Sequence, residues 1–283
     1  MTSDLETLAK QHYENFPVAS VFVPPRQRKA LRLVYAFARV ADDFADEGNF
    51  SVRERIERLD LWEKALHNAL EGNLSNAALQ NTLQQGSFFH SLASAILEFN
   101  VPVNLFDDLL TAFRMDAREP RFTSFEDLLF YCKHSANPVG RIVLYLFGSA
   151  TEQHCSWSDD ICTALQLTNF WQDYSVDIEK KRVYIPDEDL ERFGCSRGGL
   201  LNGIIGEHFP SLMKFEVERT KELFRKGSPL LRSVDTKFRF QLRLTWYGGM
   251  RVLEKIEQNH FDTVRRRVTL NMFDGALVFF RSR

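Results

Sequence analysis

The first acidic cluster of the sequence has the composition of a divalent-cation site. It closes a helix predicted to begin near Arg26, and it reads Asp42-Asp43-Phe44-Ala45-Asp46-Glu47-Gly48. Asp42 and Asp46 share a helix face, so their charges repel each other and oppose the helix dipole, each effect costing roughly a few tenths of a kcal/mol. A bound cation would reverse both effects. A solvated acidic helix end is the alternative that this cluster alone leaves open.

A second cluster places three oxygen-bearing side chains, Asn169, Asp173 and Asp177, four residues apart on one predicted helix face. Residues 161–172 carry no charge, so we expect this helix to be largely buried, and buried carboxylates need a neutralising partner. Magnesium suits such a site, because it takes one or two carboxylates and completes its shell with water and phosphate oxygens. Two facing stripes of this kind predict a magnesium–diphosphate site.

Cationic residues flank both clusters, as the binding of a diphosphate requires. Arg39 lies three residues before Asp42, and Lys180, Lys181 and Arg182 follow the second cluster. For the second group, an ordinary favourable cationic helix end is the alternative.

The elements that must position these residues have helical spacing nearly everywhere. Ser51-x-x-Glu54 is a capping box that opens a helix stopped by Gly72, and Thr123-x-x-Glu126 predicts another helix that runs to about residue 149. Pro138 lies inside this second helix and should bend it. No convincing strand period, linker or repeat interrupts the pattern. We predict an all-α bundle of about ten helices, forming a single domain over residues 1–283.

Composition excludes several classes of function. The net charge of −2 gives no whole-chain attraction to nucleic acid or to an anionic surface, so we expect no nucleic-acid partner. The four cysteines form no C-x-x-C pair, and the start of the chain lacks a signal-peptide pattern, which predicts reduced thiols and a cytoplasmic location. No run is apolar enough to span a bilayer. The 25 phenylalanines imply either an aromatic core or a cavity walled with aromatic rings.

In their order along nearly the whole chain, these motifs resemble the squalene and phytoene synthase family of trans-isoprenyl diphosphate synthases. The resemblance is carried by residues 39–46 and 169–177, by Arg182-x-Tyr184-x-Pro186, by Tyr131-Cys132 and by His12. It implies a helical bundle of the isoprenoid (terpenoid) synthase type with a central cavity. Residues 12–20, 135–140 and 169–173 resemble most closely the hydroxysqualene synthase branch of bacterial hopanoid biosynthesis, named HpnC.

The branch implies a reaction. Such an enzyme, a carbon–oxygen lyase, converts presqualene diphosphate and water to hydroxysqualene and diphosphate by magnesium-assisted ionisation, cation rearrangement and water capture. The chain departs from many squalene and phytoene synthases at Gln172, where they place an arginine, and at Ser135-Ala136-Asn137-Pro138-Val139-Gly140, where they have Val-Ala-Gly-Thr-Val-Gly. With one cation fewer, the site is less suited to two farnesyl diphosphates.

The resemblance also implies roles for individual residues. Magnesium would be held by Asp42, Asp46, Asn169, Asp173 and Asp177, and diphosphate by Arg39, Arg182 and His12. Candidates for aromatic walls around the cation are Phe16, Phe22, Tyr35, Phe37, Tyr131 and Phe170, although core packing is the alternative for each. We expect Gln166 to contact substrate, Tyr131 to assist diphosphate departure or orient a nucleophile, and Asn137, with His134 or Ser135, to hold the quenching water.

Three other interpretations remain open. A head-to-head synthase would condense two farnesyl diphosphates to presqualene diphosphate or squalene as a farnesyltransferase, and Gln172 weighs against it. A di-iron carboxylate bundle needs two Glu-x-x-His motifs, and only Glu257-x-x-His260 fits. A non-catalytic helical scaffold would leave both acidic faces solvated.

The expected cofactor is Mg²⁺. NADPH is not expected, and the chain has no G-x-G-x-x-G phosphate loop. The expected partners are an isoprenoid diphosphate substrate, upstream and downstream enzymes of the same pathway, and, through a substrate that partitions into bilayers, a peripheral contact with the inner membrane face.

Overall fold

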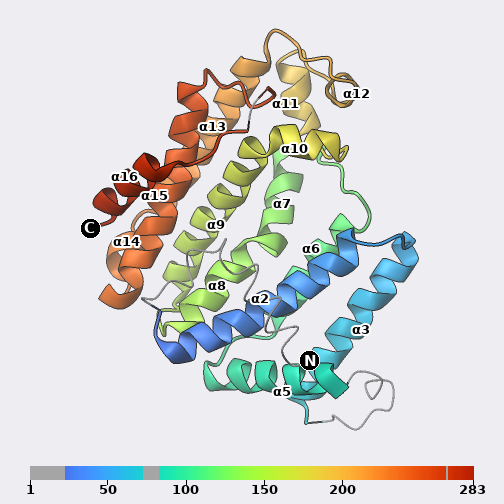
Figure 1. The fold of residues 1–283 in the computed structure, drawn as a ribbon, viewed down its shortest axis with the longest axis vertical. Helices are drawn as coiled ribbons and strands as arrows, with labels where there is room; N and C mark the ends of the chain where they lie inside the picture. The colour runs from blue at the N-terminus through green and yellow to red at the C-terminus, as the bar shows by residue number, and fades with distance from the viewer. Residues whose placement is uncertain (1–22, 73–82, 266) are drawn as a thin grey trace. The chain divides into compact units, whose positions relative to one another are not determined.

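The computed structural model describes residues 23–72, 83–265 and 267–283, and every regular element within these ranges is a helix (Figure 1). The predicted all-α class is confirmed. None of the helices in the described ranges is long and apolar enough to cross a membrane.

Ten of the described helices have ten or more residues: α2 (Pro25–Asp46), α3 (Val52–Leu70), α5 (Leu83–Glu98), α6 (Asn104–Asp116), α7 (Phe125–Ser135), α8 (Asn137–Leu146), α9 (Glu152–Gln172), α13 (Phe209–Gly227), α15 (Thr236–Gln258) and α16 (Met272–Ser282). Four short helices connect them: α10 (Tyr174–Glu179), α11 (Asp187–Arg192), α12 (Arg197–Leu201) and α14 (Leu230–Ser233).

Contacts along the chain group into two compact units. One contains the described residues up to Arg118 together with Arg141–Ala150, and the other contains Glu119–Gly140 and Thr151–Arg283. The expectation of one squalene/phytoene synthase-like domain over residues 1–283 stays a prediction.

In the first unit, α2, α3, α5 and α6 enclose an aromatic core. The ring of Phe37 stacks on Trp62 at 5.7 Å and meets the edge of Phe106 at 5.3 Å. The indole of Trp62 also donates a hydrogen bond to the carbonyl of Phe37 at 3.3 Å. Trp62 is therefore a core residue of α3, whereas the neighbouring Leu61 is exposed. Phe37, a candidate wall residue in the sequence, is fully buried in this core.

Local capping fixes where the helices start. The predicted capping box of α3 is confirmed, because Ser51 Oγ accepts from the Glu54 backbone and the Glu54 carboxylate accepts from the Ser51 backbone. The predicted box at Thr123 is wrong by one residue. Ser124 caps α7, and the Asp127 carboxylate accepts the backbone N–H groups of both Thr123 and Ser124 at 2.9 Å.

The helix predicted to bend at Pro138 is instead broken. α7 ends at Ser135, Ala136 has φ −111° and ψ −44°, and α8 starts at Asn137 with Pro138 in its first turn. Proline is well tolerated there, because the first N–H groups of a helix have no intrahelical partner. The break places two polar residues, Ser135 and Asn137, at a helix junction rather than inside a helix.

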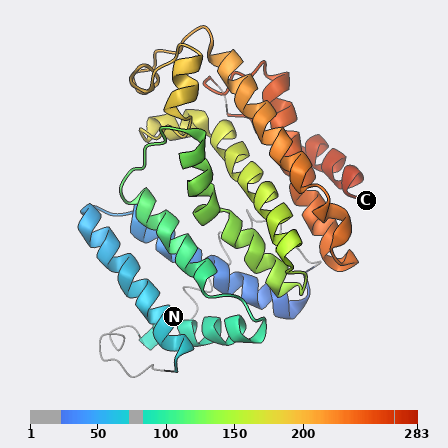
Figure 2. The same cartoon turned by 180° about the vertical axis from the view of Figure 1, so that it is seen from behind.

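In the second unit, α9 packs along α13, and α15 runs alongside them (Figure 2). The buried indole of Trp171 donates to the Thr220 hydroxyl at 2.8 Å, which ties α9 to α13. Near the other end of the contact, a Cβ on Gly227 would lie 2.6 Å from the Trp157 carbonyl. Only glycine allows this close approach, so α9 is held along its length.

Ion pairs anchor the segment that follows Pro186. Asp187, which is buried, accepts from Arg121 at 2.6 Å and from Arg197 at 2.9 Å, and its backbone N–H donates to the Phe122 carbonyl at 3.0 Å. The segment before it, with Tyr184, is thereby fixed beside the start of α7.

A second buried network joins α11 to α13. Arg219 pairs with Asp189 at 2.8 Å and with Glu216, and its guanidinium lies 3.5 Å from the centroid of the Phe125 ring. Glu216 is fully buried, and this burial raises the pKa of its carboxyl to about 8.

This pKa predicts a pH-dependent stability. Because the native pKa of Glu216 lies above its ordinary 4.5, the native state binds the proton more tightly than the unfolded chain. The stabilisation is complete below pH 4.5 and is lost as the pH rises through about 8. Glu216→Gln mimics the neutral form, so its free energy of unfolding relative to wild type should rise between about pH 4.5 and about pH 8 in urea denaturation. Parallel pH profiles of the two proteins would contradict this assignment.

Candidate active site

The first acidic cluster lies in the last turn of α2, and an arginine of the same helix neutralises it. The Arg39 guanidinium bonds Asp42 at 3.0 Å, Asp43 at 2.6 Å and Glu47 at 2.9 Å. Arg39 therefore lies on the helix face of Asp42, as its spacing indicated, and its contact with diphosphate stays a prediction. Asp46, the other predicted ligand of this helix, is exposed.

A second arginine, which sequence reasoning missed, caps this helix end. Arg55, on α3, donates to the carbonyls of Ala45 at 2.6 Å, Glu47 at 3.2 Å and Gly48 at 2.9 Å. A cation at a helix C-terminus offsets the negative end of the dipole. The repulsion predicted for four acids in one turn is therefore partly relieved by Arg39 and Arg55.

Tyr35 lies on α2 one turn before Arg39, and the charges of this cluster affect the pKa of its hydroxyl. Burial raises the pKa of its hydroxyl, and Arg39 opposes that shift while Asp42 and Asp43 reinforce it. A tyrosine next to a metal-binding carboxylate would stay protonated and act as a hydrogen-bond donor.

We predicted that one continuous helix carries the second acidic cluster, and this prediction is wrong. α9 ends at Gln172, Asp173 has φ −95° and ψ 9°, and α10 begins at Tyr174. The four-residue spacing is nevertheless preserved by the backbone, because the Asp173 N–H donates to the Asn169 carbonyl at 2.8 Å and the Asp177 N–H donates to the Asp173 carbonyl at 2.9 Å. Asn169 is exposed although the face behind it is buried.

The break allows Asp173 to meet an arginine far along the chain. Arg267 binds it with two hydrogen bonds, Nε to Oδ1 at 2.6 Å and Nη2 to Oδ2 at 3.1 Å. Next to it, the Gln172 amide donates to the Val268 carbonyl at 2.7 Å. Gln172 therefore fixes the segment that presents Arg267. The basic run at residues 265–267 was the sequence signal for this contact, and we missed it.

Asp177 has an unusual proton affinity. Burial and the charge of Asp173 raise the pKa of its carboxyl to about 6, while Arg182, Lys180 and Arg267 lower it. Arg182 is half-buried, and its backbone N–H donates to the Asp177 carbonyl at 2.9 Å, whereas Lys180 and Lys181 are exposed. The Lys180 N–H also donates to this carbonyl, at 3.0 Å, so Arg182 differs from the two lysines in its lower exposure.

Aromatic rings gather beside the second motif. Phe170 and Tyr184 stack at 3.7 Å with an interplanar angle of 9°. Tyr131 lies 6.1 Å from Phe170 and 6.4 Å from Tyr184, and Phe122 stands 5.5 Å from Tyr131. Two predicted site residues, Tyr131 and Phe170, are thus brought together. Tyr184 completes the cluster through the anchored Arg-x-Tyr-x-Pro segment.

The polar side chains at the α7–α8 junction differ in their surroundings. Asn137 is buried, and its Oδ1 accepts from the Thr163 hydroxyl at 3.0 Å, which orients the amide. His134 Nδ1 lies 2.8 Å from the carbonyl of Phe130, one turn back. The Ser135 hydroxyl oxygen is buried and has no hydrogen-bond partner among the described residues.

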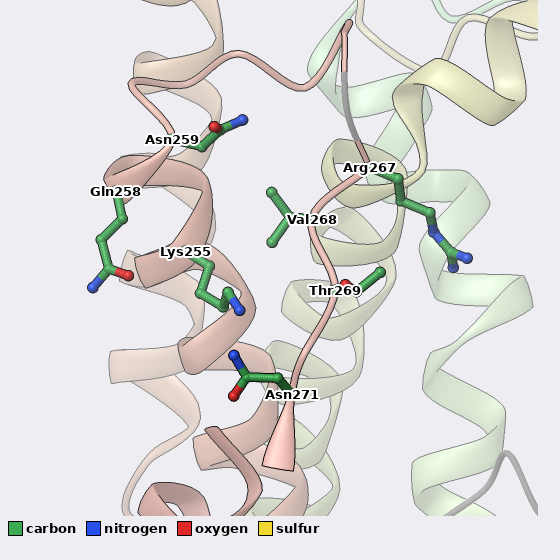
Figure 3. A pocket seen from close by; sticks show the side chains of 7 residues that line it. All are labelled: Lys255, Gln258, Asn259, Arg267, Val268, Thr269 and Asn271. Carbon is green, nitrogen blue, oxygen red and sulfur yellow. The ribbon is translucent and has the colours of Figure 1, made fainter. Parts of the chain in front are cut away.

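A surface pocket of about 400 Å³ lies between the end of α15 and the segment that leads to α16 (Figure 3). It is lined by Lys255, Gln258, Asn259, Arg267, Val268, Thr269 and Asn271. This lining is polar apart from Val268, and the Arg267 guanidinium extends away from α15 (Figure 3). The pocket does not suit a hydrocarbon chain, and the predicted central cavity stays a prediction.

Three candidates from the N-terminal part of the chain, His12, Phe16 and Phe22, lie outside the described residues. Gln166 is half-buried on α9, one turn before Asn169. Their roles stay predictions.

Two other groups could hold a metal by composition. Glu63 and His67 of α3 and Asp107 of α6 have ligand atoms within 4.8 Å of one another. Arg114 binds Glu63 at 2.6 Å, and His67 Nε2 lies 2.8 Å from the Asp107 carboxylate. In the Glu257-x-x-His260 motif, Glu257 forms an ion pair with Lys221. We assign these groups to ion pairing within the fold.

A family model described as squalene/phytoene synthase matches residues 9–274. The chain belongs to the squalene/phytoene synthase family. Members of this family process isoprenyl diphosphates and are generally metal-dependent. The resemblance seen in the sequence is therefore confirmed, and the isoprenoid synthase type of fold with it.

Relatives within the family differ in their named activities. A hydroxysqualene synthase of Sinorhizobium fredii is 30% identical over 95% of this chain and 87% of its own length. A 15-cis-phytoene synthase of Synechocystis sp. is also 30% identical, over 91% of this chain and 77% of its own length. The crystal structure of squalene synthase HpnC from Alicyclobacillus acidocaldarius is 34% identical with a TM-score of 0.82, covering 92% of this chain and 94% of that one.

The electrostatics of the second motif can be tested on Asp177. In the metal-free protein, carbon-13 NMR of labelled aspartates should give this carboxyl a pKa of about 6. Asp173→Asn removes a negative neighbour and should lower that pKa, whereas Arg267→Ala removes a positive one and should raise it. A wild-type pKa near the ordinary 3.8, or shifts of the same sign in both variants, would contradict the described geometry.

Proposed function

We propose that the protein is a hydroxysqualene synthase of squalene and hopanoid biosynthesis, converting presqualene diphosphate and water to hydroxysqualene and diphosphate. The observation that carries this proposal is the engagement of Gln172. At the position before Asp173, an amide bound to a backbone carbonyl stands where an arginine could hold a second diphosphate. The site is therefore better matched to one diphosphate than to two, and the hydroxysqualene synthase relative aligns across nearly the whole chain.

The acidic motifs have the donor chemistry that magnesium requires. Asp42 and Asp46 on α2, and Asn169, Asp173 and Asp177 at the end of α9 and in α10, offer only oxygen ligands. Magnesium bound to these residues would neutralise the diphosphate and make it a better leaving group.

The arginines at these carboxylates would then change partners. Arg39 binds Asp42, and Arg267 binds Asp173. Once the carboxylates serve as metal ligands, the guanidiniums can bind diphosphate oxygens, for which their planar forks are well suited. Arg182, half-buried beside Asp177, adds a third cation.

The aromatic cluster would protect the carbocation that forms when diphosphate leaves. The rings of Phe170, Tyr184 and Tyr131 exclude water and attract a cation, an interaction worth about 2 kcal/mol or more in a desolvated site. The Tyr131 side chain is 5% exposed, so its hydroxyl acts in a nearly dry environment, where it can assist departure or orient the nucleophile.

Water capture would be controlled at the α7–α8 junction. The buried Ser135 hydroxyl lacks a partner among the described residues, and a bound water would satisfy it. Asn137, oriented by Thr163, lies two residues away in the chain. We assign both residues to the water that quenches the rearranged cation, with His134 as a more exposed neighbour.

The hydrocarbon of the substrate would bring the protein to a bilayer. Presqualene diphosphate partitions into membranes, which favours a peripheral contact with the inner membrane face from a cytoplasmic location. Enzymes that supply presqualene diphosphate and consume hydroxysqualene would be its pathway partners.

The proposed reaction is tested by product identification. With presqualene diphosphate and Mg²⁺, mass spectrometry should detect hydroxysqualene at the same rate with and without NADPH. Squalene that appears only with NADPH would contradict water capture. Farnesyl or geranylgeranyl diphosphate should give no product; a condensation product would instead assign the chain to the head-to-head synthases, the second candidate supported by the equally similar phytoene synthase.

The proposed water site predicts a change in product ratio. Ser135→Ala and Asn137→Ala should each lower hydroxysqualene formation roughly tenfold, the equivalent of one lost hydrogen bond. Consumption of presqualene diphosphate should fall less, so non-hydroxylated hydrocarbons should accumulate. Ser94→Ala, which removes an exposed hydroxyl on α5, serves as the control. Normal rate and purity in both variants would remove the water-holding role.

A further inference from the structure

Helix α16 presents its apolar side chains outward. Asp274, Val278 and Ser282, spaced four residues apart, are buried, and the helix packs on α15 at the edge of its unit (Figures 1 and 2). Met272, Phe273, Ala276 and Phe280 occupy the opposite side, and we call them the α16 outer face. Met272 is 90% exposed, Phe273 86% and Phe280 69%.

The rotation of α16 is fixed by its polar side. Asp274 binds Arg251 at 2.7 Å and Lys255 at 2.6 Å, both on α15, and it also forms a capping box with Asn271. Turning the outer face inward would break these ion pairs and expose the carboxylate. These ion pairs therefore keep Phe273 and Phe280 exposed. A contiguous exposed apolar surface of this kind marks an interaction site.

Positive charge accompanies the outer face. Residues 263–283 contain five arginines and a single acid, Asp274, which α15 already neutralises. Two of these arginines are paired with carboxylates elsewhere in the unit, Arg267 with Asp173 and Arg281 with Glu254, so among the described residues the cations that border the outer face are Arg265 and Arg283. The Arg283 guanidinium lies 4.7 Å from the Phe279 ring and 5.9 Å from the Phe280 ring, at the border of the apolar surface. Arg265 is 88% exposed in its side chain.

We propose that the α16 outer face docks on an anionic lipid bilayer, with its phenylalanines among the acyl chains and its arginines at the headgroups. Apolar side chains beside cations complement an anionic membrane surface. A second copy of the chain fits less well, because a symmetric contact would bring the same arginines together. The proposal deepens the membrane contact that the proposed function includes, by giving it a surface.

The position of α16 connects this surface to the acidic site. The segment that carries Arg267, bound to Asp173, and Val268, bound to Gln172, runs directly into the Asn271 cap of α16. A bilayer at the outer face would thus hold the second acidic motif close to the phase in which isoprenoid diphosphates reside.

The test is flotation of the full chain with vesicles and without substrate, so its outcome is independent of the reaction catalysed. The protein should float with phosphatidylcholine vesicles that contain about 30% phosphatidylglycerol, and less with phosphatidylcholine alone or at high salt. Phe273→Ser/Phe280→Ser should lower the bound fraction about tenfold or more. Leu61→Ser/Leu97→Ser removes two side chains of similar exposure, 64% and 65%, and should bind as wild type does.

Two results would overturn the proposal. One is equal flotation of wild type and the α16 double variant, with circular dichroism showing both folded. The other is a wild-type oligomer that the same double variant dissociates in sedimentation velocity without vesicles, which would assign the outer face to a second copy of the chain. Flotation is measured without substrate, so failure of the proposed reaction would leave the flotation result unchanged.

Discussion

The carboxylates of each acidic motif repel one another, so each motif needs nearby positive charge. Acids in the last turn of a helix are unfavourable, and Asp177 is partly desolvated as well. In the structure each motif is balanced by an arginine: Arg39 within the same helix, and Arg267 from a segment far along the chain. In the proposed function these arginines would bind diphosphate, and the carboxylates with which they are paired would take magnesium.

Contacts elsewhere in the second unit position Asp173 and the aromatic rings beside it. Trp171 and Gly227 fix α9 against α13, and the break at Asp173 opens its carboxylate to Arg267. The anchored Asp187 places Tyr184 against Phe170. Aromatic surface and acidic oxygens therefore meet at one end of α9, an arrangement suited to a substrate that is charged at one end and hydrocarbon at the other.

Residue spacing predicted those features that depend on interactions within a single helix. The Ser51 capping box, the buried face of α9 and the pairing of Arg39 with Asp42 all follow from spacing within one helix. The shift of the second capping box to Ser124 depended on competition between adjacent hydroxyls, which spacing does not resolve.

Long-range contacts could not be predicted in this way. Arg267 and Asp173 are 94 residues apart, and no periodic pattern links them. Arg55 reads in the sequence as an ordinary helix-surface residue, yet it caps the neighbouring helix. The outward orientation of α16 was missed for the same reason, because it is set by Arg251 and Lys255 on another helix.

The exchange of arginine for magnesium at Asp173 is measured most directly by titration calorimetry. In the proposed function Arg267 would compete with the metal for Asp173 but assist diphosphate, so Arg267→Ala should bind Mg²⁺ alone more tightly than wild type and pyrophosphate with Mg²⁺ more weakly. Arg265→Ala, which removes an exposed arginine two residues away, should match wild type in both titrations. No heat with wild type and magnesium pyrophosphate, or the same change in both affinities for Arg267→Ala, would contradict the account.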